Sequence, residues 1–281
     1  MATVQKFLPQ DNSSQANFDA WVEGIHDAIV NTMGWVQTAD TGQAGTNPSV
    51  PSNAYVYRIY RMDDALQSTY PVFLKLEFGY SSTSVRIRAQ LGVATDGAGN
   101  FVGYTTGLVS FASYANQGAT GLECNFSGSP GRLGIMMWRT GTSANGLFFG
   151  IERTLATDGT PNSDGVNIVA SFYQNTAFQQ TLVFGVGPGN TWTRPITLSV
   201  GAADAFNNNV PVSPVFPDYG KYGNPMTIVA NMNGADVADG ALIQTTLYGA
   251  TRIYLASKTN GWSGNFGMLL TNVYALLMRY D

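Results

Sequence analysis

Residues 72–91 have the sequence VFLKLEFGYSSTSVRIRAQL, with apolar side chains at alternate positions from 72 to 78 and again from 85 to 91. A period of two places the apolar residues of each segment on one face, and the polar stretch GYSSTS separates the segments. This pattern predicts an antiparallel β-hairpin. On the charged face, Glu77 comes within cross-strand reach of Arg86 or Arg88, a pairing worth up to about 1 kcal/mol. We interpret these charges as hairpin stabilisation rather than as a site.

Further strands follow at short spacing, separated by turns rich in Gly, Asn and Asp. Many short strands with almost no helix between them favour an antiparallel β-sandwich or jelly roll over a parallel α/β sheet. The last segment is nearly all apolar and could also form a short buried helix, but Gly267 before it favours a strand. The predicted strands are 101–112, 121–127, 132–140, 146–156, 165–174, 180–187, 192–200, 226–232, 241–256 and 266–280.

One amphipathic α-helix is predicted near the N-terminus. Its apolar residues recur every three or four positions, which gives one continuous stripe. Ser14 is a suitable N-cap, and Gly34 supplies the left-handed residue that commonly ends a helix. Residues 1–37 therefore form an N-terminal helix with its lead-in, and residues 38–281 form a β-rich domain. The stripe consists of Phe18, Trp21, Val22, Ile25, Ala28, Ile29 and Met33.

Two stretches interrupt the β pattern. Residues 38–53 cluster Gly, Pro, Asn and Ser and predict a loop. Residues 206–225 contain several prolines, each of which removes a hydrogen-bond donor that a sheet would use. This second stretch is either a long surface loop or an extended, polyproline-like arm laid on a neighbouring subunit.

The composition is unusual for its low charge. Charged residues make up 11% of the chain, whereas ordinary globular domains have about 25%. Disorder does not explain this, because hydrophobic residues reach 44% and the net charge is only −4. Interface cores are depleted in charge and enriched in aromatic residues and Met, and this chain has 14 Tyr, 15 Phe, 5 Trp and 9 Met. The composition favours a subunit that assembles with neighbours over a secreted polar β protein.

Several classes of protein are disfavoured by the same inspection. Residues 1–15 lack the apolar core of a signal peptide, and no run approaches the roughly 18 apolar residues that span a bilayer. The pI of about 4.9 argues against direct binding of nucleic acid. The single cysteine, Cys124, cannot form an internal disulfide and is expected to be a buried small hydrophobe. We expect no membrane insertion, and folding in a cytoplasm.

Catalytic residues are not apparent. The only histidine, His26, lies on the polar side of the predicted helix beside Asp27, so we interpret it as solvated rather than as a member of a Ser-His-Asp triad. One histidine also excludes a multi-His metal site. We therefore predict no catalytic, metal or cofactor-binding residue, and no enzyme activity.

The carboxylates and one loop offer two alternative kinds of site. The strand-borne acids are Glu77, Glu123 and Glu152, and Arg153 directly follows the last of them. Nothing in the sequence singles out the acid and nucleophile of a glycoside hydrolase. Residues Asp158 to Asp164 faintly resemble a calcium loop but lack its alternating ligands and terminal Glu, so a hairpin loop is the better interpretation.

Scattered segments resemble bacteriophage virion structural proteins, without assigning the chain to one family of them. The segments are Phe18-Asp-Ala-Trp21 leading to Gly34-Trp35, Tyr60-Arg-Met-Asp-Asp-Ala65 before a Pro-Val-Phe strand, Phe148-Phe-Gly-Ile-Glu-Arg153 before an Asp-Gly turn, and Leu247-Tyr-Gly249. The resemblance implies a place in the tail, baseplate, collar or capsid surface, as a ring or trimer that contacts other virion proteins.

We therefore predict a virion structural subunit that forms homo-oligomers through closed symmetric interfaces. A first alternative is a receptor- or carbohydrate-binding decoration or fibre module that recognises a host surface glycan, since four aromatic residues lie in or near predicted turns. A second alternative is a polysaccharide-degrading hydrolase. The four aromatic residues are Trp192, Tyr219, Tyr222 and Trp262.

Overall fold

A computed structural model of the chain shows a mainly β protein with one helical segment near the N-terminus. Its strands form three antiparallel sheets, which we call the N-terminal, central and C-terminal sheets. The structure describes residues 1–10, 14–45, 54–81, 84–105, 108–115, 118–139, 147–153, 167–173, 180–186, 196–197, 212–216, 226–233, 237–238, 240–247, 249–259 and 274–281.

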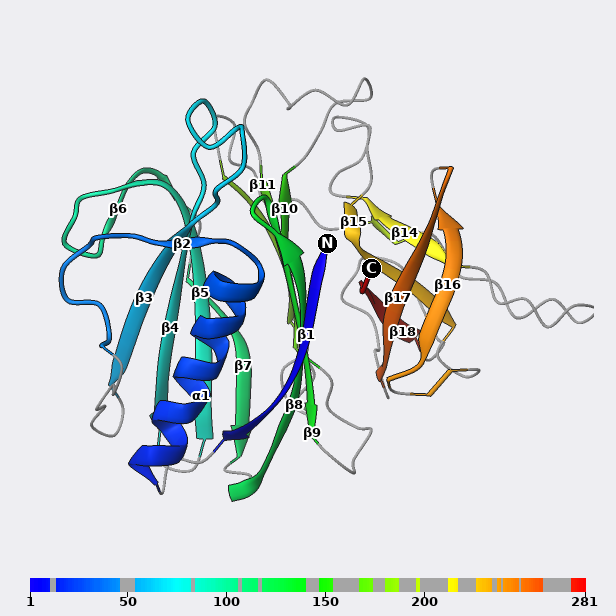
Figure 1. Cartoon of the computed structure of the whole chain (residues 1–281), viewed down its shortest axis with the longest axis horizontal. Coiled ribbons are helices and arrows are strands. Elements are labelled where there is room, and N and C mark those ends of the chain that lie inside the picture. The colour runs from blue at the N-terminus through cyan, green and yellow to red at the C-terminus, as the bar shows by residue number, and fades with distance from the viewer. Residues whose placement is uncertain are drawn as a thin grey trace, which may run out of the picture.

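The central sheet lies between the other two (Figure 1). Its strand order is β1 (Ala2–Gln10), β8 (Gly118–Ser129), β9 (Arg132–Arg139), β10 (Leu147–Arg153), β11 (Asn167–Tyr173) and β12 (Gln180–Val186). The N-terminal sheet has the order β2 (Val36–Gln37), β3 (Tyr55–Arg61), β4 (Phe73–Ser81), β5 (Ser84–Thr95) and β6 (Phe101–Thr105), and β7 (Val109–Ala115) also pairs with β5. The C-terminal sheet has the order β13 (Ile196–Thr197), β14 (Ser213–Phe216), β15 (Met226–Asn233), β18 (Tyr274–Arg279), β17 (Ala250–Thr259) and β16 (Leu242–Leu247).

The N-terminal helix forms as its sequence predicts. Helix α1 (Gln15–Asp27) continues into a π-helical turn, η1 (Ala28–Thr32). The Ser14 side chain accepts a hydrogen bond from the backbone N–H of Asn17 at 3.3 Å, and Gly34 has a φ of 76°. The apolar stripe is buried, and Trp21 meets Phe78 of β4 edge-on. The helix therefore covers one face of the N-terminal sheet (Figure 1).

One core joins the helix, the N-terminal sheet and the central sheet. It contains Phe18 and Trp35 from one side of the predicted boundary at residue 37, and Tyr60 and Leu122 from the other. Burial of this shared apolar surface is the main stabilising contribution of the sandwich. The two chain segments thus pack together in the structure.

The middle of the central sheet is buried on both faces. In β9 every residue from Leu133 to Trp138 is buried, which is typical of a strand covered on both sides. Ile135 belongs to the core with the helix, whereas Gly134 faces the C-terminal sheet. Gly134 lies opposite Gly150 of β10, and a Cβ at Gly134 would come 2.9 Å from the Met278 sulfur. The glycine pair therefore permits the close approach of the C-terminal sheet.

Comparison with the predicted elements shows where the sequence pattern succeeds. The hairpin over 72–91 is β4–β5, and the terminal segment is a strand. The expected strand 101–112 is two strands, and the expected strand 241–256 is the β16–β17 hairpin, because Gly249 turns the chain at a φ of 73°. β1 was not predicted from the sequence.

The proline-rich segment is only partly described. Within 206–225, the residues of β14 form a strand of the C-terminal sheet, and its register against β15 shifts after Pro214. These four residues are thus part of the chain's own sheet rather than of an arm, and the remainder of the predicted arm lies outside the described residues. The loop at 38–53 is described only as far as residue 45. Residues 38–45 contain a turn but no strand or helix, as predicted.

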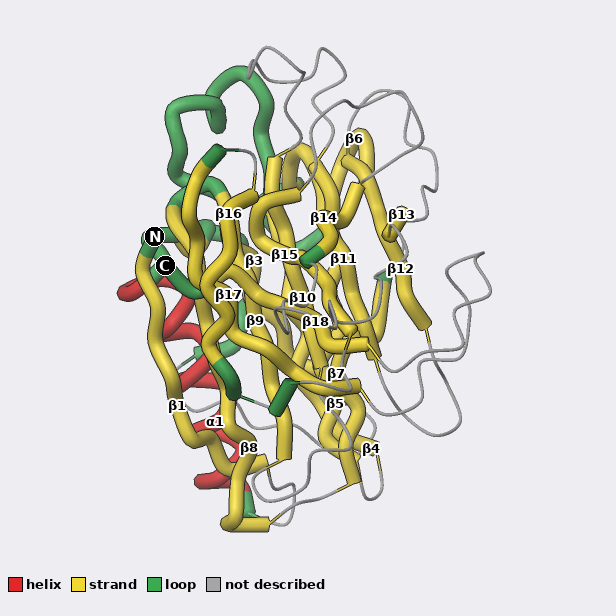
Figure 2. Tube along the Cα trace, turned by 90° about the vertical axis from the view of Figure 1, so that its right-hand side faces the viewer, coloured by secondary structure: helices red, strands yellow, loops and turns green. Residues whose placement is uncertain are grey.

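The two termini meet at the junction of the central and C-terminal sheets (Figures 1 and 2). The Arg132 guanidinium, on β9, lies 3.8 Å from the Met1 sulfur. The Tyr280 hydroxyl donates to the Oδ1 of Asn125, on β8, at 3.4 Å. In the described part of the chain, no helix has the length and apolar character needed to cross a membrane.

Candidate functional site

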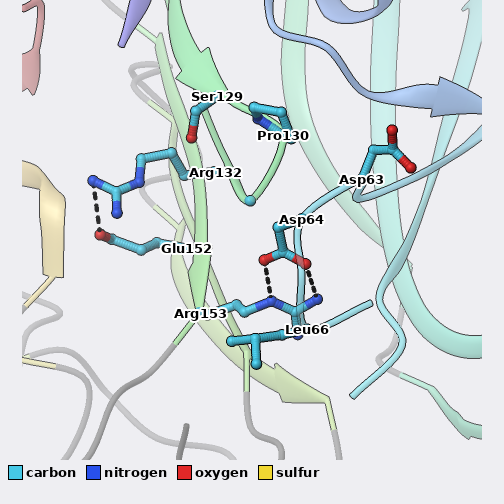
Figure 3. Close-up of a pocket in the computed structure, with 9 residues that line it drawn as sticks. Asp63, Asp64, Leu66, Ser129, Pro130, Arg132, Glu152 and Arg153 are labelled. Carbon is cyan, nitrogen blue, oxygen red and sulfur yellow. Dashed lines mark hydrogen bonds and ion pairs between the residues drawn. The ribbon is translucent and has the colours of Figure 1, made fainter. Parts of the chain in front are cut away.

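An open depression lies where the central sheet meets the loop between β3 and β4 (Figure 3). The β8–β9 turn and the end of β10 form its other walls. We treat it first as a candidate site because charged side chains converge on it. The lining residues are Asp63, Asp64, Leu66, Ser129, Pro130, Gly131, Arg132, Glu152 and Arg153.

Arg153 of β10 binds the loop between β3 and β4. Its Nε and Nη2 donate to the two carboxylate oxygens of Asp64 at 2.6 and 2.8 Å, and its Nη1 donates to the Tyr70 carbonyl at 2.6 Å. Such a two-point pair fixes both position and orientation. The Arg153 side chain is only 7% exposed. Its guanidinium charge is therefore compensated by Asp64 of the loop, and its donors are used within the chain.

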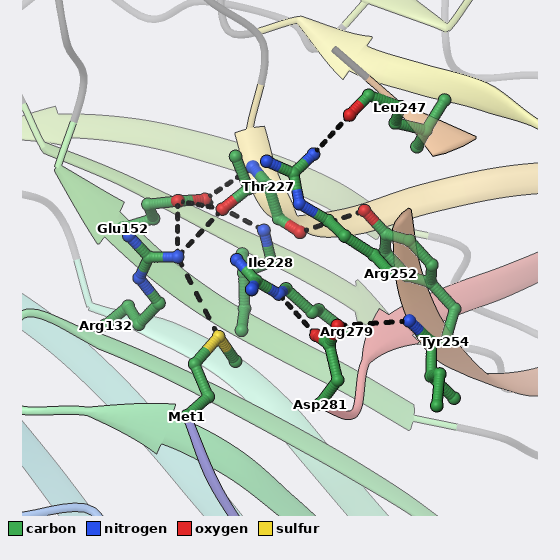
Figure 4. A network of polar contacts seen from close by, with 11 residues as sticks. Met1, Arg132, Glu152, Thr227, Ile228, Leu247, Arg252, Tyr254, Arg279 and Asp281 are labelled. Carbon is green, nitrogen blue, oxygen red and sulfur yellow. Dashed lines mark hydrogen bonds and ion pairs between the residues drawn. The ribbon is translucent and has the colours of Figure 1, made fainter. Parts of the chain in front are cut away.

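Glu152, the preceding residue, points to the opposite face and binds the C-terminal sheet (Figure 4). Its Oε2 accepts the backbone N–H groups of Thr227 and Ile228 at 2.7 and 2.9 Å. Arg132 Nη1 lies 3.6 Å from the Glu152 Oε1 and donates to the Thr227 hydroxyl at 3.0 Å. A buried carboxylate needs such partners to offset its desolvation. Adjacent residues of one strand thus fasten the central sheet to the structure on either side.

No carboxylate in the described residues is left without a partner, which bears on the hydrolase alternative. A glycoside hydrolase needs two acids that converge on the substrate with their oxygens available. Here each acid accepts a hydrogen bond or forms an ion pair within the chain. The acids are Asp19, Glu23, Asp27, Asp40, Asp63, Asp64, Glu77, Asp96, Glu123, Glu152 and Asp281.

His26 is not the solvated residue that its position on the helix predicts. Its Nδ1 lies 3.2 Å from the hydroxyl of the fully buried Tyr60, on β3. Partial burial, followed by the positive charge of Arg58, lowers the His26 pKa, although Glu23 and Asp27 act in the opposite direction. The interpretation of His26 as a solvated residue is therefore wrong. The helix docks on β3 through this side as well as through its apolar stripe.

Arg58, which sequence inspection missed, holds the helix to the same strand. Its guanidinium forms an ion pair with Glu23 and donates to the Gly45 carbonyl at 2.6 Å. The side chain is 3% exposed. The signal that could have found it is the isolated arginine in the apolar strand YVYRIY, but the pairing with a helix residue depends on tertiary docking.

Two other predicted residues lie where the sequence places them. Cys124 is buried in the shared core, and burial raises the pKa of its thiol, so the prediction of a small buried hydrophobe is confirmed. Glu77 lies opposite Arg88 rather than Arg86 and forms an ion pair with it. The Arg88 guanidinium in turn lies 3.5 Å from the centre of the Tyr55 ring, a favourable cation–π contact.

Other predictions lie outside the described residues. These are the loop from Asp158 to Asp164 and the aromatic residues proposed for glycan stacking, namely Trp192, Tyr219, Tyr222 and Trp262. Among the residues that are described, no group of three or more potential metal ligands gathers. The glycan and ion predictions therefore remain predictions.

A second candidate site is the edge of the C-terminal sheet at β16, which is an outermost strand among those that the structure describes. Leu242 at its start is 60% exposed. On the same face of the neighbouring strand β17, Ile253 is 37% exposed. We call β16 together with Ile253 the β16 surface. The two exposed aliphatic residues lie diagonally across the β16–β17 pair, and such exposure suits a surface that meets another protein.

Comparison with known proteins gives no assignment: no protein-family model matches the chain, and neither does any curated protein.

Proposed function

We propose that this chain is a structural subunit of a bacteriophage virion, assembling with copies of itself and with other virion proteins. Support for assembly comes from the β16 surface, an uncharged strand with an exposed aliphatic residue at the edge of a sheet. Support for a virion role comes from the resemblance of segments such as Tyr60–Ala65 and Phe148–Arg153 to virion structural proteins.

The use of charge within the molecule supports the same proposal. Only 11% of residues are charged, and several of these act between layers, as Glu152 and Arg153 do. Charge used internally leaves less for the surface. A surface poor in charge is typical of subunits that bury part of it against neighbours.

Two of the segments that resemble virion proteins are joined by a contact that suits a rigid subunit. Asp64, in the segment Tyr60–Ala65, and Arg153, in Phe148–Arg153, form the two-point pair of the depression. The segments that carry the resemblance thus contact each other across the sandwich. This contact is consistent with a scaffold role and needs no substrate.

The proposal is tested by the mass of the purified chain and by its presence in particles. We expect sedimentation equilibrium to give a mass above that of one chain, and virions of the phage that encodes it to contain the protein in several copies. A chain that remains monomeric at high concentration and is absent from purified particles would rule the proposal out.

A further inference from the structure

β16 lacks the features that normally protect the edge of a sheet. Natural edge strands are commonly short, or carry lysine, proline or a bulge that prevents pairing with another chain. β16 has the sequence LIQTTL, with no charge and no proline. Its register against β17 is continuous from Leu242 opposite Leu255 to Leu247 opposite Ala250.

The outer strands elsewhere in the described structure differ from β16. β1 contains Pro9, directs Lys6 to Asp27 of the helix, and has a register shift. β2 and β13 are two residues long, and β6 has a register shift against β5. β7 and β12 lie on the side where the N-terminal and central sheets approach each other, beside β11 and β5 respectively.

Alternate residues of β16 direct their backbone polar groups to the open edge. In an antiparallel pair, opposed residues alternate between bonded and non-bonded pairs. Ala256 donates its N–H to the Ala241 carbonyl at 2.9 Å, whereas the Ile253 carbonyl accepts from the Tyr280 N–H, on the β18 side, at 2.8 Å. Gln244 lies opposite Ile253, so the N–H and C=O of Gln244 point away from β17. Among the described strands, none lies beyond β16 to pair with them.

We propose that β16 pairs antiparallel with β16 of a second copy of this chain, about a two-fold axis, so that two C-terminal sheets become one continuous sheet. This inference rests on the proposed function, because it names the surface and the partner through which the subunit assembles. Strand addition at a free edge supplies backbone hydrogen bonds, and side chains on either face set the partner.

Charge favours a second copy as the partner. In a two-fold antiparallel pair the residue on the axis faces its own copy, and every other residue faces another residue of the same strand, so a charged residue at the axis would face a like charge. Every cross-strand pair formed by LIQTTL with itself is neutral, whichever residue lies on the axis. The inner face keeps its place in the chain's own core, where Ile243 and Leu247 pack against the cluster around Tyr254. The exposed Leu242 gains a covering neighbour from the second copy.

The test uses three substitutions at Gln244, whose side chain is exposed. Gln244→Pro removes an outward N–H that β17 does not use. Gln244→Lys introduces one positive charge from each copy into the same short pair of strands, and the two charges lie closest where the axis passes at Gln244. Gln244→Thr is the matched control, because it keeps the N–H and adds no charge. We expect sedimentation equilibrium to show dimerisation weakened at least about tenfold by Pro and by Lys, and little changed by Thr. Circular dichroism during thermal unfolding confirms that each variant is folded.

Each outcome decides between distinct conclusions. If the wild type associates and both the Pro and Lys variants associate equally well, self-pairing of β16 is wrong while the proposed virion role stands. If Gln244→Pro does not fold, Gln244→Lys decides, since its backbone is unaltered. If the wild type is a monomer at every concentration, or only binds a different virion protein, self-pairing is overturned, and its absence from particles would overturn the proposed function too.

Discussion

At the scale of single residues, Arg153 is expected to contribute strongly to stability, because it is a buried charge with a paired carboxylate. Removing one partner of a buried, hydrogen-bonded pair leaves the other charge without compensation. We expect Arg153→Met to lower the free energy of unfolding by about 3 kcal/mol, measured by urea denaturation. The matched control is Arg61→Met, because the Arg61–Asp63 pair is exposed at 37% and 49% and should contribute less than about 1 kcal/mol. Equal losses in the two variants would contradict the assigned role of Arg153.

His26 gives the protein a pH dependence whose sign follows from its lowered pKa. In the unfolded chain His26 takes up a proton near the ordinary histidine pKa of about 6.5, whereas folded His26 has a lowered pKa and resists protonation. The unfolded state therefore binds more protons as the pH falls below about 6.5, and stability decreases in that range. Above that pH the imidazole is neutral in both states and contributes no such loss.

The variant that checks this effect is His26→Gln, which cannot titrate. We expect the wild type to lose more stability than His26→Gln between about pH 7.5 and about pH 5. Glu23, Asp27, Arg58 and Tyr60 surround the ring in both proteins, so their effects are shared. Parallel stability curves for the two proteins would show that His26 is not the responsible group.

Residue pairs could be predicted from the sequence only where they are local. The Glu77–Arg88 pair lies within one hairpin, so the alternation that predicts the strands also brings the charges together. Asp64 and Arg153 are 89 positions apart, and nothing in either local sequence indicates the other. The contact of His26 with Tyr60 was missed for the same reason, because it depends on how the helix docks.

At the scale of secondary-structure elements, the close approach of the C-terminal sheet depends on glycines. A Cβ at Gly150 would lie 2.6 Å from the buried Phe148 ring and 3.4 Å from Ile228 of β15. Overpacking of this kind costs about 1–3 kcal/mol, so we expect Gly150→Ala to lower the thermal midpoint. Gly45→Ala is the control, because a Cβ there meets nothing within 4 Å. A neutral Gly150→Ala would mean that Phe148 rearranges freely.

Elements with a strong period were predictable, and those defined by their partners were not. The helix has a cap, an apolar stripe and a terminal glycine, all of which the structure contains. β1 lacks a clear alternation and contains Pro9, and it is a strand because β8 provides a partner along its length. The sequence predicts one strand over 241–256 in place of the β16–β17 hairpin, because the turn between the two strands is short.

At the scale of the whole molecule, the order of the three sheets is a tertiary property. Composition and spacing predict an antiparallel β protein, which the structure confirms. The burial of both faces of β9 could have been suspected from the continuous run Leu133–Trp138, in which every residue is apolar or glycine. The identity of the layers on each face depends on pairs such as Glu152 with the amides of Thr227 and Ile228, which no local pattern specifies.

That pair makes a prediction about how the layers separate. Glu152 is 7% exposed and accepts two backbone N–H groups of β15, so Glu152→Gln replaces a charged acceptor by a weaker one and leaves Arg132 without its counter-charge. We expect amide hydrogen exchange to quicken in β15, β17 and β18 more than in β4 and β5. Glu77→Gln is the reciprocal control: it removes the ion pair with Arg88 and should quicken exchange in β4 and β5 instead. If both variants accelerate exchange equally in all three sheets, the molecule unfolds as one cooperative unit. In that case the C-terminal sheet does not open independently of the other two sheets at the Glu152 junction.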